Sequence, residues 1–211
     1  MPQPAKSPTG ELFTHSRIRS PELLSLYQPE SAQHYVQFYD HDSVVIENVA
    51  YLVVRALERD GAVVIVATEA HLHAIQQRLS ASAADLEQAR QDGRYMTLDA
   101  ADTLQQLLTD GMPDKAKFDL VVGGIMRTAA QNCPTGFVFA FGEMVALLCA
   151  GQKPDAAVRL EQLWNGLAHQ QRFSLYCAYS LDSFTAASAD LKAFFEICSA
   201  HALTIPAETP L

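Results

Sequence analysis

The sequence predicts a three-layer α/β fold in which helices cover both faces of a mostly parallel, doubly wound β-sheet. Apolar runs with strand-like composition alternate along the chain with segments whose apolar residues recur at helical spacing. The run AVVIVAT at 62–68 is continuously apolar up to its last residue, which is typical of a central strand buried on both faces. Strands joined through helices pair in parallel with right-handed crossovers, so the sheet is expected to be doubly wound.

The first half of the chain begins this alternation with the strand HYVQFY at 34–39. Apolar residues at helical spacing predict a helix over 43–60, and Gly61 follows it where a helix would end. The strand at 62–68 comes next. Further on, the sequence predicts a helix at 69–79, a short helix at 84–92 closed by Gly93, a strand at 95–100, and a helix that opens at Asp102 and ends at Gly111.

The second half continues the alternation after one ambiguous segment. Residues 119–126 fit a strand, a helix or both. Pro154 is a good first helical residue and opens a helix over 154–171. The remaining predicted elements are strands at 137–141 and 174–179, helices at 142–151 and 189–201, and an edge strand at 202–206.

The composition fits one globular domain preceded by a leader. The chain has 211 residues, of which 49% are hydrophobic and 18% are charged, enough for one substantial core. Prolines recur through the first 30 residues with Ser, Thr and Gly between them, which predicts a flexible leader over residues 1–30. Residues 31–211 are then expected to form a single α/β domain.

Charge and cysteine usage argue against several partners. The formal net charge is −9, with no basic cluster beyond Lys115 and Lys117, so direct nucleic-acid binding is not expected. No apolar stretch is long enough to cross a bilayer, and the start lacks the apolar region of a secretory signal, so no membrane partner is expected. The four cysteines are far apart without a C-x-x-C pair, which favours free thiols and a cytoplasmic location.

The turn after the first strand lacks a phosphate-binding loop. A Walker loop needs glycines, a lysine and a Ser or Thr, whereas residues 39–43 supply only Ser43, and no G-x-G-x-x-G occurs elsewhere. Asp40 and Asp42 would repel a triphosphate at close range. The sequence therefore predicts a degenerate phosphate loop, an acidic turn at a helix N-terminus, and no nucleotide-driven catalysis.

Ligands of doubly wound sheets bind at the carboxyl ends of the strands, so the candidate ligand-binding residues are sought there. Glu69 also fits a helix N-terminus favoured by the helix dipole, and Glu143 fits either a ligand contact or a helix N-terminus. Trp164 also fits the core, although Asn165 beside it allows a ligand role. The candidates are Tyr39, Glu69, Asp99, Glu143, Trp164 and Asn165.

No catalytic or metal site is predicted from spacing. The histidines match neither H-x-x-x-H nor H-E-x-x-H, and His71 and His73 do not converge on a helix. There is no G-x-S-x-G elbow, and Cys177 has no base beside it in the sequence. We therefore expect no catalytic residues, no metal and no cofactor.

Several strings, in this order, resemble the MEDS domain, the methanogen/methylotroph and DcmR sensory domain. They are HYVQFYD, VVIVATEAH, DGRYMTLDAADTL, FVFAFGEMVALL, RLEQLWNGLA, FSLYCAYSLDSF and FFEICSAHALTIPAE, and the resemblance covers about residues 31–210. It implies a RecA/KaiC-like fold that has lost its phosphate-binding lysine, and a role in sensing small molecules. Members sit beside histidine kinase, PAS or helix-turn-helix modules. This chain shows no such module, so the signal is expected to pass in trans to a partner such as a histidine kinase or transcription regulator.

Three functional hypotheses follow. The first is a non-enzymatic sensory or regulatory module that binds a small, partly apolar molecule and shifts between two conformations. The second is an interaction protein with a vestigial nucleotide pocket, in which a homo-oligomer is possible. The third, ranked last because the phosphate cradle is missing, is a residual nucleotide-binding protein.

Overall fold

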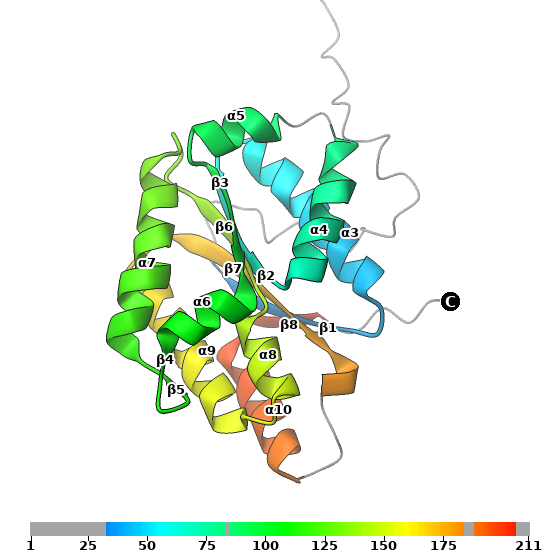
Figure 1. The fold of residues 1–211 in the computed structure, drawn as a ribbon, viewed down its shortest axis with the longest axis vertical. Helices are drawn as coiled ribbons and strands as arrows, with labels where there is room; N and C mark the ends of the chain where they lie inside the picture. The colour runs from blue at the N-terminus through cyan, green and yellow to red at the C-terminus, as the bar shows by residue number, and fades with distance from the viewer. Residues whose placement is uncertain (1–32, 83–84, 184–187, 206–211) are drawn as a thin grey trace, which may run out of the picture.

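The computed structural model describes residues 33–82, 85–183 and 188–205. Six strands of the described residues form one sheet in the order β3-β2-β6-β7-β1-β8, and all neighbouring pairs are parallel (Figure 1). These strands are β1 (His34–Tyr39), β2 (Ala62–Ala67), β3 (Tyr95–Asp99), β6 (Val138–Gly142), β7 (Phe173–Ser180) and β8 (Leu203–Ile205). The parallel, doubly wound sheet expected from the sequence is thereby confirmed.

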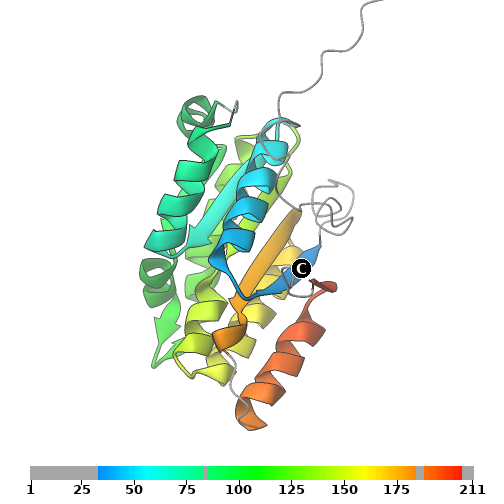
Figure 2. The ribbon, with the colours of Figure 1, turned by 90° about the vertical axis from the view of Figure 1, so that its right-hand side faces the viewer.

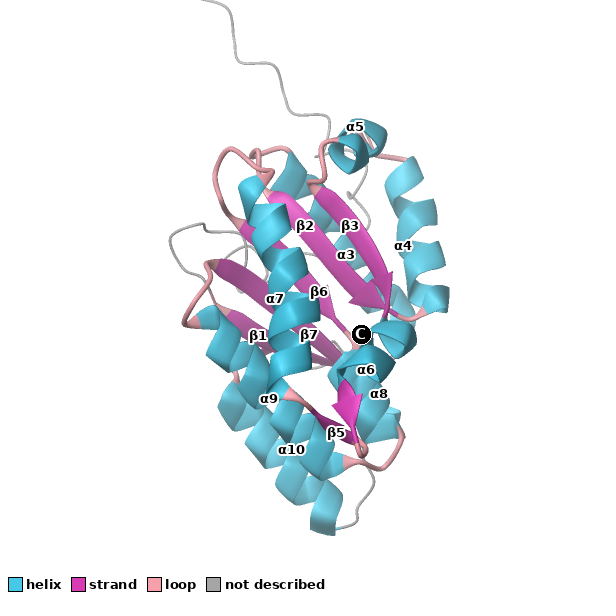
Figure 3. Ribbon diagram, turned by 60° about the vertical axis from the view of Figure 1, so that its left-hand side comes forward, coloured by secondary structure: helices cyan, strands magenta, loops and turns pink. Residues whose placement is uncertain are grey.

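Helices cover both faces of this sheet, which gives the three layers (Figures 1 and 2). The first face carries α3 (Asp42–Leu57), α4 (Glu69–Ser80) and α5 (Leu86–Gln91). The second face carries α6 (Ala100–Leu107), α7 (Lys115–Gln131), α8 (Met144–Ala150), α9 (Pro154–Ala168) and α10 (Ser188–Ala200). Figure 3 shows α7 crossing in front of the sheet.

Each face of the sheet has its own apolar core because successive strand residues point to opposite faces. Strand β7 shows this alternation. Leu175, Cys177 and Tyr179 face the layer with α7 and α9, whereas Tyr176 and Ala178 face the layer with α3. All five are almost fully buried, so β7 is a central strand covered on both sides.

The register brings the carboxyl ends of the strands to one edge of the sheet. Tyr39 of β1 pairs with Ser180 of β7, Gly142 of β6 pairs with Cys177, and Ala67 of β2 pairs with Asp99 of β3. Strands β1 and β2, although consecutive in the sequence, are separated by β7 and β6. The turns after β1, β2 and β6 therefore lie along the edge where α/β sheets bind ligands.

The structure assigns one segment that was ambiguous in the sequence and corrects the end of one predicted helix. The ambiguous residues 119–126 lie inside α7, a single helix whose N-cap Asp114 accepts a hydrogen bond from the backbone N–H of Lys117. The helix expected to run to Gly111 instead ends at Leu107, which is a correction. Asp110 and Gly111 have φ of 48° and 80° and form the turn between the short antiparallel strands β4 (Leu108–Thr109) and β5 (Met112–Pro113).

The leader predicted for residues 1–30 lies outside the described residues. Within the described part of the chain, no helix has both the length and the apolar character needed to cross a membrane.

Candidate functional site

The six candidate residues separate into different surroundings. Tyr39 and Glu143 lie at the carboxyl edge of the sheet. Burial raises the pKa of the Tyr39 phenol, and the nearby Glu143 carboxylate raises it further. Glu69 and Asp99 begin helices at the same edge. Trp164 and Asn165 lie in α9, on the face of the sheet covered by α7 and α10.

Glu143 links two turns of the carboxyl edge. It follows β6 and precedes α8, and its side chain is 3% exposed. One carboxylate oxygen accepts a hydrogen bond from the backbone N–H of Thr68 at 2.8 Å, and the other lies 2.5 Å from Nδ1 of His71. Glu143 was expected to contact either a ligand or a helix N-terminus. It contacts a helix N-terminus, but that of α4 and not that of α8, which it precedes.

His71 is held between two carboxylates. Its Nδ1–H donates to Glu143, and its Nε2 lies 3.5 Å from a carboxylate oxygen of Asp42. The hydrogen bond to Glu143 raises the pKa of His71 above its usual value, against the opposing effect of burial, and Asp42 adds to the rise. Asp42 opens α3 in the turn where a phosphate loop would lie, so the acidic turn pairs with His71.

Asp99 and Glu69, the other two candidates at the carboxyl edge, both lie at helix N-termini. Asp99 is the N-cap of α6, and its carboxylate accepts a hydrogen bond from the backbone N–H of Asp102 at 2.9 Å. Glu69 is the first residue of α4, with its carboxylate at the positive end of the helix dipole. Glu69 is exposed and lines a hollow of about 770 Å³ together with Ala70, Leu72, His73, Gln76 and Thr97.

Trp164 is a core residue. Its side chain is 1% exposed, and its ring meets Phe118 edge-on with centroids 5.3 Å apart. Phe173 lies on another side, with a centroid distance of 6.1 Å. The sequence left open a core role for Trp164, and the structure shows that role.

Asn165, which is partly buried, belongs to a group of mostly buried side chains that the sequence did not bring together. We call this group the buried polar cluster, and it lies between α9, the sheet and the end of α10. Its members come from β1, α9, β7 and the residue after α10: His34, Glu161, Asn165, Cys177, Tyr179 and His201.

The buried polar cluster is tightly connected. Asn165 donates its side-chain amide to the backbone carbonyl of Ala200 at 2.9 Å, and its carbonyl oxygen accepts from His34 Nδ1 at 2.9 Å. The sulfur of Cys177 lies 3.3 Å from His34 Nε2. The Tyr179 hydroxyl donates to Glu161, which is 1% exposed.

Burial sets the protonation of this cluster. It lowers the pKa of His34 to about 4, so this imidazole is neutral at pH 7. Burial, with the nearby Glu161 carboxylate adding to it, raises the pKa values of the Cys177 thiol and the Tyr179 phenol, so both keep their protons. His34, Cys177 and Tyr179 therefore surround Glu161 as neutral groups.

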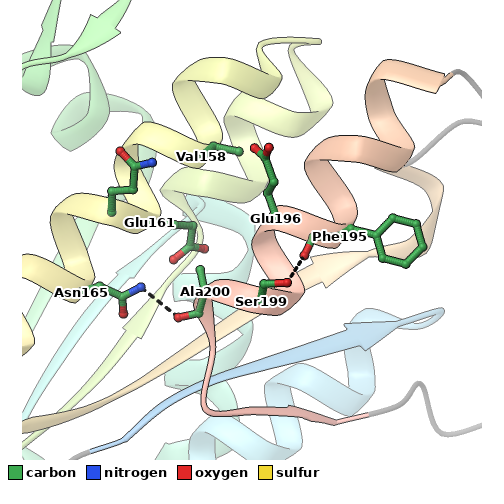
Figure 4. Close-up of a pocket in the computed structure, with 8 residues that line it drawn as sticks. Val158, Glu161, Asn165, Phe195, Glu196, Ser199 and Ala200 are labelled. Atoms are coloured by element: carbon green, nitrogen blue, oxygen red, sulfur yellow. Dashed lines mark hydrogen bonds between the residues drawn. The ribbon is translucent and has the colours of Figure 1, made fainter.

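A groove between α9 and α10 reaches this cluster (Figure 4). Its volume is about 580 Å³, within the range of small-molecule pockets. Figure 4 shows the Glu161 carboxylate between the two helices and the ring of Phe195 pointing away from it. The described residues that line the groove include two acids and no base: Val158, Glu161, Gln162, Asn165, Phe195, Glu196, Ser199 and Ala200.

Comparison with known proteins identifies the family. The family model described as MEDS, the methanogen/methylotroph, DcmR sensory domain, matches residues 33–201. This range spans most of the 211 residues and includes every strand except the last. No curated protein matches the sequence. The chain therefore belongs to the MEDS family of sensory domains.

Proposed function

We propose that the chain is a non-catalytic sensory module that binds a small molecule in the groove between α9 and α10. Membership of a sensory-domain family supports a sensing role. The observation that carries the placement is the groove itself, which has the volume of a small-molecule site and reaches the buried carboxylate of Glu161.

The lining of the groove favours a neutral or cationic ligand. Glu161 and Glu196 contribute carboxylates, and the described lining residues contribute no lysine, arginine or histidine to balance them. Val158 and Ala200 supply apolar contact, while Gln162 and Ser199 supply hydrogen-bonding groups. An anion would meet uncompensated negative charge in this groove, so phosphates and carboxylates are unsuitable ligands.

Helix α10 offers a route from ligand to partner. A molecule lodged between α9 and α10 favours whichever arrangement of the two helices fits it best, which shifts the population between them. Phe195 lies one helical turn before Ser199, and its side chain is 65% exposed. Its exposed ring would move with α10, and it suits contact with a signalling protein in trans, such as a histidine kinase or a transcription regulator.

The acidic residues at the carboxyl edge of the sheet support a function without nucleotide chemistry. The turn after β1 presents Asp42 to His71, and Glu143 occupies the other imidazole nitrogen. Two carboxylates at this position oppose the binding of a triphosphate. The alternative in which the chain is a residual nucleotide-binding protein predicts measurable ATP affinity here.

Three four-carbon probes that differ in charge test the ligand class. We expect ligand-detected NMR to show n-butylamine and n-butanol binding to the full chain and butyrate binding at least about tenfold more weakly, because the groove is acidic. Ser199→Tyr fills the groove and should abolish both signals. Ser80→Tyr is the matched control, since Ser80 is also an exposed helix serine whose hydroxyl donates to a backbone carbonyl of the preceding turn.

Three results would count against the proposal. Equal or stronger binding of butyrate would contradict the charge argument. If the amine still binds to Ser199→Tyr but no longer binds to Ser80→Tyr, the ligand site is not the groove. If none of the three probes binds to the unaltered chain, the groove does not bind small molecules of this kind.

A further inference from the structure

We propose that four members of the buried polar cluster form a four-coordinate site for a divalent transition metal of the Zn²⁺ class. We call it the four-ligand site. It goes beyond the sensory proposal. Glu161 belongs to both sites, but the test below uses metal ions alone and so does not depend on a molecule in the groove. Its ligand atoms are His34 Nε2, Glu161 carboxylate oxygen, Cys177 Sγ and His201 Nε2.

The four side chains already converge. Their ligand atoms all lie within 4.8 Å of one another, and all four side chains are buried. His34 Nε2 lies 3.3 Å from the Cys177 sulfur and 3.4 Å from a Glu161 oxygen. A tetrahedral ion bound at about 2.0–2.3 Å holds its ligand atoms about 3.3–3.8 Å apart, so these two distances already match a coordination shell.

The hydrogen bonds of His34 fix which of its nitrogens is bare. Asn165 donates its amide nitrogen to the carbonyl of Ala200, so its oxygen faces His34 Nδ1 and must accept a hydrogen bond from it. The proton of the neutral imidazole is therefore on Nδ1. Nε2 carries a lone pair directed at Cys177 and Glu161, which is the state in which a histidine binds a metal ion.

His201 is oriented in the same way. Its Nδ1 lies 2.6 Å from the backbone carbonyl of Ile197, which can only accept, so Nδ1 carries the proton. In the neutral form of the ring, Nε2 carries a lone pair and lies 3.6 Å from the Glu161 carboxylate. A ring N–H that donates to a backbone carbonyl is the usual outer-shell partner of a metal-binding histidine.

In this orientation the lone pair of His201 Nε2 faces the lone pairs of the Glu161 carboxylate. Within the described part of the chain, His201 Nε2 and one carboxylate oxygen of Glu161 are buried without a hydrogen-bond partner. The other Glu161 oxygen is satisfied by the Tyr179 hydroxyl. Orphaned buried polar atoms are rare in folded proteins and commonly mark a bound ion or water. A cation between these lone pairs would satisfy both at once.

The donor types select the ion. Two imidazoles, one thiol and one carboxylate form a mixed nitrogen, sulfur and oxygen set that suits Zn²⁺ and similar transition metals, whereas Mg²⁺ and Ca²⁺ require oxygen ligands. On binding, the Cys177 thiol releases its proton to solvent and the thiolate coordinates the ion. The two positive charges of the ion then balance the Glu161 carboxylate and the Cys177 thiolate, so the buried site is neutral.

A filled four-ligand site would join β1, α9, β7 and the end of α10 at one point. His201 follows directly after α10, so the ion would fix that end of the helix against the sheet. Because four protein ligands leave no open position, the site would be structural or regulatory rather than catalytic.

Cobalt titration of the full chain without a histidine tag tests this proposal. We expect one Co²⁺ to bind, with the intense visible bands of a four-coordinate ion and a sulfur-to-cobalt charge-transfer band. Zn²⁺ should displace it. The Cys177→Ser and His201→Gln variants should each lose at least about 100-fold in Zn²⁺ affinity, because each removes a ligand. Cys133→Ser is the matched control, since Cys133 is also buried and the hydrogen-bond partners of its sulfur lie within four residues of it in the sequence.

The titration separates loss of folding from loss of binding. The charge-transfer band is measured on the unaltered chain, so it does not depend on whether a variant folds, and circular dichroism of each metal-free variant identifies any that do not. Absence of Co²⁺ binding, an octahedral spectrum without a thiolate band, or a band kept by Cys177→Ser and lost by Cys133→Ser would each overturn the proposal.

Discussion

Replacement of Trp164 by alanine is expected to lower the free energy of unfolding by about 3–5 kcal/mol, one of the largest single-residue effects in the chain. The side chain is 1% exposed and packs edge-on against Phe118, with Phe173 beside it. Its removal leaves a cavity that the surrounding sheet and helices can fill only in part. Urea denaturation followed by circular dichroism measures the loss.

A matched change separates packing from ligand contact. Trp164→Phe keeps an aromatic ring in the same space and should cost about 1–2 kcal/mol, in the lower part of the range for buried large-to-small changes. This variant should bind n-butylamine as the unaltered chain does, because Trp164 does not line the groove. A loss of stability below about 1 kcal/mol for Trp164→Ala would contradict the core role.

The second large effect is expected at Glu143. Glu143→Gln removes the charge that pairs with His71 while it keeps an oxygen able to accept from the backbone of Thr68. We expect a loss of roughly 2–3 kcal/mol at pH 6, the range for a buried hydrogen bond between charged groups. Urea denaturation at a series of pH values measures it.

The pH dependence of this loss follows from the raised pKa of His71. A folded pKa above the unfolded value of 6.5 means that the pair stabilises fully below about pH 6.5 and that its contribution is lost as the pH rises through the folded value. The difference between the unaltered chain and Glu143→Gln should therefore shrink at alkaline pH. Glu58→Gln is the control. It breaks a half-exposed helix pair with Arg55 and should cost less than about 1 kcal/mol. A Glu143→Gln loss that is independent of pH would contradict the pairing.

Local sequence patterns predicted most of the fold because strands and helices of this chain have strong periodicity. The apolar run at 62–68 and the largely apolar β7 are both central strands, and both are buried on their two faces. The hairpin of β4 and β5 escaped prediction because Gly111 serves a tight turn, a role that looks the same in the sequence as a helix end. The segment of α7 was ambiguous because its apolar residues and paired glycines fit either element.

The candidate site was only partly predictable. Placement of Tyr39 and Glu143 at the carboxyl edge follows from the parallel direction of the strands, which the alternation of strands and helices implies. The partnership of Glu143 with His71 depends on β6 lying beside β2, a pairing that no local pattern specifies. The buried polar cluster combines His34 with residues more than 120 positions away, so the spacing rules for metal motifs could not detect it.

Native mass spectrometry of the freshly purified chain tests the central claim, that this MEDS domain binds a small molecule between α9 and α10. The proposal predicts a one-to-one adduct, too heavy to be a single metal ion, on the unaltered chain and on Ser80→Tyr, and its absence from Ser199→Tyr. An unliganded mass for all three proteins, unchanged by n-butylamine, would contradict it. So would an adduct of equal occupancy on all three, because a filled groove cannot hold the ligand.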